Sequence, residues 1–135
     1  MTEFLLIISL IAPPILYFIE KILPYPYLLE ELLKYFLVRS LFRCPYSSFS
    51  PLKTVVALAL VFSFSENILY LPEIISSGKI YLFYFRLLFD GFLHLATFLL
   101  LFFGQTKNRL LGIMSLVIAI IVHYLFNLFS TAIIP

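Results

Sequence analysis

The sequence predicts an all-α protein, a polytopic membrane helix bundle of about five transmembrane helices that forms a single integral membrane domain over residues 1–135. Hydrophobic residues make up 63% of the chain, charged residues only 12%, and the mean hydropathy is +1.10. The apolar residues gather in five runs, each close to the roughly 20 residues with which a helix crosses the hydrocarbon core of a bilayer. Proline, glycine or charged residues separate these runs, as expected for connections between membrane helices.

Residues at the ends of the five runs bound the expected spans. The first lacks the basic start and the cleavage site of a signal peptide, so we expect a retained span, kinked at Pro13 and Pro14. The third is expected to stop at Pro72, and the fourth at Gly104, because proline and glycine commonly follow helix ends. The expected spans are residues 4–19, 27–42, 54–71, 80–103 and 110–134.

The second run carries charges that hydropathy alone would assign to a surface helix: Glu30, Glu31, Lys34 and Arg39. The connections after the second and fourth runs are both basic, and basic connections favour the cytoplasmic side. Both lie on one side only if residues 27–42 cross the membrane. We therefore predict a multi-pass protein of the cell membrane with a cytoplasmic amino terminus. The basic residues that carry this argument are Arg39, Arg43, Lys53, Lys107 and Arg109.

Composition also excludes several functions. The net charge is only +2, and the nine basic residues are scattered, so no nucleic acid is expected as a partner. Cys44 is the only cysteine, which excludes an intramolecular disulfide, a cluster of thiolate ligands and a CxxC redox pair. It lies in a loop rich in proline and serine, far along the chain from both histidines, which disfavours a nucleophilic role. The expected partners are the lipid bilayer and a membrane protein.

Polar residues inside the apolar runs are the best indication of function. Each ionisable side chain near a bilayer centre costs about 2.5 to 3.5 kcal/mol, so several in a small chain indicate a shared polar site. Depth in the membrane can be estimated by counting 1.5 Å per residue from the basic connections. By this count the second to fifth runs bring acids and imidazoles to similar depths, roughly 15 to 20 Å. The clusters are Glu30, Glu31 and Lys34; Glu66 and Asn67; Arg86 and Asp90; His94; and His123 with Asn127.

Structural interpretations compete with a site. Residues four apart share a helix face, so Glu30 with Lys34 and Arg86 with Asp90 can form intrahelical ion pairs. His94 and His123 can simply hydrogen-bond neighbouring helices. As chemistry, two adjacent carboxylates and two imidazoles are sufficient to activate water against a carbonyl, which favours a peptidase. Glu66, His94 and His123 are candidate metal ligands, with zinc left open because no HExxH motif is present.

The polar residues resemble the motifs of a known family. Residues 30–34 match an EExxK motif, residues 62–70 an FxxxEN segment followed by tyrosine, and His94 and the HxxxN run from His123 to Asn127 match two later histidine motifs. In this order, over about residues 29–129, the chain resembles the PrsW-type intramembrane proteases. That family is related to the CAAX prenyl endopeptidases and to the gamma-secretase subunit APH-1.

The resemblance implies a glutamate-dependent endopeptidase that hydrolyses a peptide bond of a membrane-bound protein, such as the membrane-anchored anti-sigma factors cleaved by PrsW members. It implies that Glu30 or Glu31 activates water with His94, that His123 and Asn127 stabilise the oxyanion, and that Lys34 orients the carboxylates. Glu66 would be a supporting or metal-binding carboxylate, with Asn67 and Arg86 in support. The alternatives are a non-catalytic membrane scaffold and, less favoured, an ion or proton pathway. Substrate, prenyl recognition and oligomeric state stay open.

Overall fold

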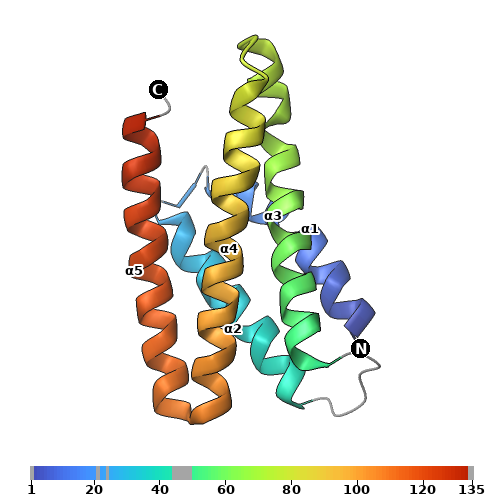
Figure 1. Cartoon of the computed structure of the whole chain (residues 1–135), viewed down its shortest axis with the longest axis vertical. Helices are drawn as coiled ribbons and strands as arrows, with labels where there is room; N and C mark the ends of the chain where they lie inside the picture. The colour runs from blue at the N-terminus through green and yellow to red at the C-terminus, as the bar shows by residue number, and fades with distance from the viewer. Residues whose placement is uncertain (1, 21, 24, 44–49, 134–135) are drawn as a thin grey trace.

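The chain folds into a bundle of five helices (Figure 1). The computed structural model describes residues 2–20, 22–23, 25–43 and 50–133, and these residues contain no strand. The predicted all-α fold class is therefore confirmed, whereas Cys44 lies outside the described residues. The helices are α1 (Thr2–Glu20), α2 (Pro26–Arg43), α3 (Pro51–Ser76), α4 (Tyr81–Lys107) and α5 (Arg109–Ile133).

Four of these helices, α1, α3, α4 and α5, are long and apolar enough to cross a membrane. Large apolar side chains cover their outward faces, as expected for surfaces in contact with lipid. Helix α2 is too charged to qualify by composition, but Glu30, Glu31 and Lys34 are buried inside the bundle. The charged face of α2 is thus turned into the bundle, while the outer surface is apolar. The crossing of α2 and the cytoplasmic amino terminus stay predictions.

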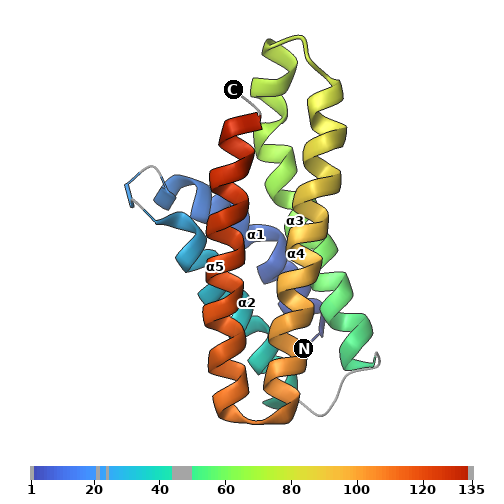
Figure 2. The same cartoon turned by 60° about the vertical axis from the view of Figure 1, so that its left-hand side comes forward.

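The helix arrangement agrees with the argument from the basic connections. Figures 1 and 2 show that α2 ends and α3 begins at the same end of the bundle as the α4–α5 connection, while the α3–α4 turn lies at the opposite end. Helix α2 packs against α1, α4 and α5, and α3 packs against α1 and α4. Each helix that carries a predicted polar cluster therefore faces at least one other such helix.

Two predicted helix ends are wrong. Helix α3 continues through Pro72 to Ser76, and the chain turns only at Gly78, whose φ of 70° is readily adopted by glycine. Helix α4 passes Gly104 and ends at Lys107. Proline inside a helix removes one backbone hydrogen bond, and a membrane helix tolerates this loss when neighbouring helices support it. Glycine does not stop a helix that is packed on both sides.

The prolines of α1 have a specific partner on α3. Pro14 lacks the N–H that would bond to the carbonyl of Leu10, four residues earlier. The Ser65 hydroxyl donates to that carbonyl at 2.6 Å, and Ser9 of α1 donates to the carbonyl of Leu58 at 2.8 Å. These two hydrogen bonds join α1 to α3, and the first gives the carbonyl freed by Pro14 a partner.

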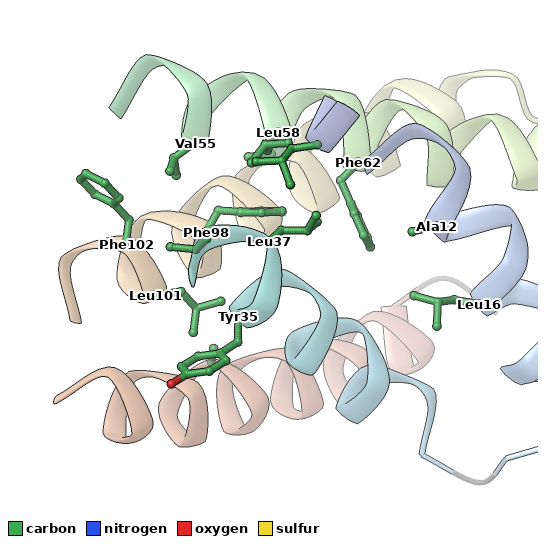
Figure 3. Close-up of a cluster of buried hydrophobic side chains, with 14 residues drawn as sticks. Ala12, Leu16, Tyr35, Leu37, Val55, Leu58, Phe62, Phe98, Leu101 and Phe102 are labelled. Atoms are coloured by element: carbon green, nitrogen blue, oxygen red, sulfur yellow. The ribbon is translucent and has the colours of Figure 1, made fainter. Parts of the chain in front are cut away.

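The apolar core lies between α2, α3 and α4, with α1 along one side (Figure 3). Phe62 of α3 and Phe98 of α4 are fully buried, and their rings lie 6.0 Å apart in an edge-to-face arrangement. Both rings also border the polar residues described below. The core side chains that Figure 3 labels are Ala12, Leu16, Tyr35, Leu37, Val55, Leu58, Phe62, Phe98, Leu101 and Phe102.

A methyl group at Gly104 should separate α4 from α5. Its Cβ would lie 2.6 Å from Cβ of Ser115 and 2.9 Å from the carbonyl oxygen of Leu111, both too close. We expect Gly104→Ala to lower the free energy of unfolding in detergent by about 1 to 3 kcal/mol. Gly91→Ala is the control, because its Cβ would meet Ser63 at an ordinary 3.5 Å. Equal stability of the two variants would contradict this close approach.

Candidate active site

Side chains from four helices meet in one buried polar cluster. The α-helical period places each of them on the inward face of its helix. The apolar side chains of the outward face can then remain in contact with lipid. Helix α2 provides three residues, α3 one, α4 four and α5 one. They are Glu30, Glu31 and Lys34; Glu66; Arg86, Asp90, His94 and Thr97; and His123.

The first part of the cluster surrounds Glu31, which is completely buried. Its Oε1 atom accepts hydrogen bonds from Nζ of Lys34 at 2.5 Å and from Nδ1 of His123 at 2.7 Å. The Nε2 atom of the same imidazole lies 3.8 Å from Oε2 of Glu30. The ring of His123 therefore lies between two adjacent carboxylates of α2, and α5 is joined to α2 through it.

Lys34 is also completely buried. Besides Glu31, its Nζ donates to the hydroxyl of Thr97 at 3.4 Å, and it lies 5.3 Å and 5.9 Å from the ring centres of Phe62 and Phe98. The aromatic faces and the carboxylate together stabilise the buried ammonium. The spacing of four allowed an intrahelical pair with Glu30, and the structure shows an ion pair of Lys34 with Glu31, three residues earlier.

The second part of the cluster surrounds Glu66. Its Oε2 lies 2.7 Å from Nε2 of His94, and its Oε1 lies 3.6 Å from Nη2 of Arg86. Arg86 also pairs with Asp90, at 3.1 Å, and its guanidinium lies 3.5 Å from the ring centre of Tyr70. The expected pairing of Arg86 with Asp90 is present, and the same arginine also supports the carboxylate that faces His94.

The two parts form one continuous cluster. The rings of His94 and His123 are perpendicular, with centres 6.0 Å apart. One oxygen each of Glu30 and Glu66 and one ring nitrogen of His94 lie within 4.8 Å of one another. The common depth estimated from the sequence thus corresponds to real contact between helices.

The cluster contains more carboxylates than lysine and arginine cations. Four carboxylates face two cations, Lys34 and Arg86, which leaves a formal excess of two negative charges if both imidazoles are neutral. Uncompensated charge is costly in a low-dielectric interior. Protonation of two of these carboxylates or imidazoles, or one divalent cation, would balance it.

The donor atoms suit a divalent cation. Glu30, Glu66 and His94 offer two oxygens and one nitrogen, and three protein ligands with an open fourth position are typical of catalytic zinc sites. This set contains Glu30, whereas the sequence had grouped His123 with Glu66 and His94. His123 is instead held by Glu31 through Nδ1. In the described part of the chain, Nδ1 of His94 has no hydrogen-bond partner.

Two predicted site residues lie at the margin of this cluster. Asn67 is buried and donates to the carbonyl of Ser63 on its own helix, at 2.9 Å. Asn127 is half-buried, one turn beyond His123 on α5.

The sequence reasoning missed two neighbours of the cluster. Thr97 bonds to Lys34 and donates to the carbonyl of His94 at 3.2 Å. Its position three residues after His94 places it on the same face, a pattern that would have found it. The ring of Tyr27 lies 6.3 Å from that of His123, and no spacing in the sequence indicates this contact.

Fold and cluster together define a polytopic membrane protein with a buried carboxylate and imidazole site of the kind that hydrolases use. The chain belongs to the PrsW family of intramembrane metalloproteases, because residues 22–135 match the model of that family. The match includes every residue of the cluster and confirms the resemblance seen in the motifs. The relation to CAAX endopeptidases and APH-1 stays an expectation. No curated protein and no solved structure matches the chain.

Removal of Lys34 should destabilise the fold. Lys34→Met leaves the buried carboxylate of Glu31 without its cation, and breaking a buried pair from one side costs about 3 to 5 kcal/mol. In Glu31→Gln/Lys34→Met both charges are absent, so we expect part of that loss to be recovered. The free energy of unfolding of both variants is measured in detergent, with circular dichroism as the signal. Lys79→Met, at an exposed turn, is the control. A double variant less stable than Lys34→Met would contradict the coupling.

Proposed function

We propose that this protein is an intramembrane endopeptidase that hydrolyses a peptide bond of a membrane-bound protein, with the buried cluster as its catalytic site. The observation that carries the proposal is the direct contact between carboxylates and imidazoles from four helices, in a chain of a membrane protease family. A peptide bond in this interior would meet groups that accept, hold and return protons with little competing water.

The contacts favour Glu30 over Glu31 as the base. Oε1 of Glu31 already accepts two hydrogen bonds, from Lys34 and His123, so Glu31 is better suited to orient His123. Glu30 lies beside both His123 and the pair of His94 and Glu66. In the proposed reaction Glu30 and His94 take the proton of the attacking water and return it to the leaving amine.

His123 and Asn127 are the proposed oxyanion donors. They lie four residues apart on α5, hence on one face of that helix. The imidazole of His123 is hydrogen-bonded through Nδ1 to Glu31, and Glu31 also accepts a hydrogen bond from Lys34. A carboxylate behind an imidazole sets its orientation and stabilises its protonated form, so His123 is supported as a donor to developing negative charge.

A divalent cation would be held by Glu30, Glu66 and His94. When bound, it would polarise the scissile carbonyl and make a water molecule more acidic. The three donors and the formal negative excess support such an ion, with zinc the ion that we propose. In the metal-dependent form of the proposal Glu30 and His94 would be ligands, and in the metal-independent form they accept and return the proton.

Loss of the base should abolish cleavage without loss of the fold. We expect Glu30→Gln and His94→Ala to reduce cleavage at least about 100-fold. Cleavage is measured by mass spectrometry in proteoliposomes that contain a library of single-span fusion proteins. Glu73→Gln, which alters an exposed carboxylate near the end of α3, should keep full activity. Full activity in Glu30→Gln and His94→Ala would contradict the proposed mechanism.

Metal content provides a test that does not depend on the substrate. We expect the purified protein to hold about one divalent metal ion per chain, and Glu66→Gln and His94→Ala to weaken its retention by about 10- to 100-fold. Elemental analysis after dialysis measures this, with Glu73→Gln again as control. A metal-free protein that cleaves in the presence of chelator would contradict the metal-dependent form.

A non-catalytic assembly role is the second candidate. It is favoured by the fact that each imidazole is already paired with a carboxylate, as in helix contacts that serve only stability. Under this alternative, Glu30→Gln and His94→Ala lower the unfolding temperature or the recovery of a partner protein, and even the unaltered chain cleaves no member of the library.

A further inference from the structure

A basic pocket lies at the end of the bundle where α4 connects to α5. Its volume is about 250 Å³, and α2, α4 and the start of α5 line it. Among its lining residues are three arginines and two amides but no acidic side chain. We call this the basic pocket and define it by Arg39, Arg43, Gln105, Asn108 and Arg109.

The pocket is held in shape by hydrogen bonds at its wall. Nη1 of Arg39 donates to the hydroxyl of Tyr35 at 3.3 Å, and Nε2 of Gln105 donates to the carbonyl of Tyr35 at 3.1 Å. The second bond joins α4 to α2. Arg39 is half-buried, whereas Arg43 and Arg109 are exposed. The pocket is thus a formed concavity between three helices.

The three arginines of the basic pocket carry charges that no carboxylate among the described residues neutralises. No ion pair to a carboxylate is found for Arg39, Arg43 or Arg109 within the described ranges. Guanidinium groups gathered around one cavity repel one another, and an anion between them removes that repulsion. The planar fork of arginine suits phosphate in particular, because it donates two parallel hydrogen bonds.

The depth of the pocket matches the headgroup region of a bilayer. Arg39 lies eight residues beyond Glu31 on α2, hence roughly 12 Å from the level of the polar cluster toward the helix end. Arg109 begins α5. Basic pockets between membrane helices at this level are typical sites for anionic lipid headgroups, and the predicted orientation places this end on the cytoplasmic side.

An apolar groove adjoins Arg43, one of the three arginines of the basic pocket. It has a volume of about 310 Å³, is lined by α1 and α2 through Phe4, Leu33, Phe36 and Leu37, and also includes Arg43. A lipid offers both a phosphate for the arginines and an acyl chain for such a groove. A free phosphate ion would use only the first.

We propose that the basic pocket binds the phosphate of an anionic lipid headgroup, with an acyl chain of that lipid along the groove between α1 and α2. The site would anchor the ends of α2, α4 and α5 to the membrane surface. It is separate from the polar cluster and does not depend on proteolysis, so its test needs no substrate.

Lipid retention by the whole chain tests this proposal. The protein is purified in micelles that contain equal amounts of phosphatidylglycerol and phosphatidylcholine, and bound lipid is measured by native mass spectrometry. We expect preferential retention of phosphatidylglycerol, reduced about tenfold in Arg43→Gln/Arg109→Gln. Lys53→Gln/Lys107→Gln is the matched control, because it removes the same charge at the same end of the bundle from residues that do not line the pocket. This control should lose less than about twofold.

A third variant separates the shape of the arginine side chains from their charge. Arg43→Lys/Arg109→Lys keeps the charge but not the fork, so we expect intermediate retention. Circular dichroism and gel filtration show whether each variant is folded, and both altered arginines are exposed. Equal losses in the arginine and lysine variants would overturn the proposal in favour of general attraction. Displacement of the retained lipid by millimolar inorganic phosphate would overturn the assignment to a lipid.

Discussion

The buried ion pair of Lys34 and Glu31 is the constraint on which the rest of the bundle depends. Neither side chain is exposed, and neither is tolerable against hydrocarbon. Helix α2 must therefore turn this face inward, where α4 supplies Thr97 and α5 supplies His123. The apolar helices around α2 satisfy that requirement and present their own large apolar side chains to the lipid. A helix that composition assigns to the surface thus becomes the centre of the polar cluster.

Close contact between helices makes the cluster possible. Gly104 brings α4 so close to Ser115 of α5 that a Cβ at this position would not fit. On the other side of α3, Ser65 bonds to a carbonyl of α1 that Pro14 leaves without a partner. Small residues and hydrogen bonds replace the hydrophobic effect as the means of helix association in lipid. Short distances between axes then allow side chains of ordinary length to meet across four helices.

The cluster is closed at one side and more open at the other. The side chains of Glu31 and Lys34 have no exposed area, whereas those of Glu66 and Arg86 are 15% and 29% exposed. In the proposed function, the buried pair of Glu31 and Lys34 would orient the site, and the more exposed side of Glu66 and Arg86 would meet water or substrate. Membership of an intramembrane metalloprotease family is consistent with such a site. The same helix α2 extends from this cluster to the arginines of the basic pocket, so both features share one rigid element.

Sequence alone determined the helices and the level of the site, because apolar runs of membrane length and a constant rise per residue specify both. It also indicated the family through the order of its polar motifs, and the family match over residues 22–135 confirms that resemblance. Only the tertiary structure decided the partners: His123 with Glu31, His94 with Glu66, Lys34 with Glu31 instead of Glu30, and Gly104 as a contact instead of a helix end. Partner choice depends on how far each helix is rotated about its axis and how closely it approaches its neighbour. Neither quantity is set by counting residues along a single helix.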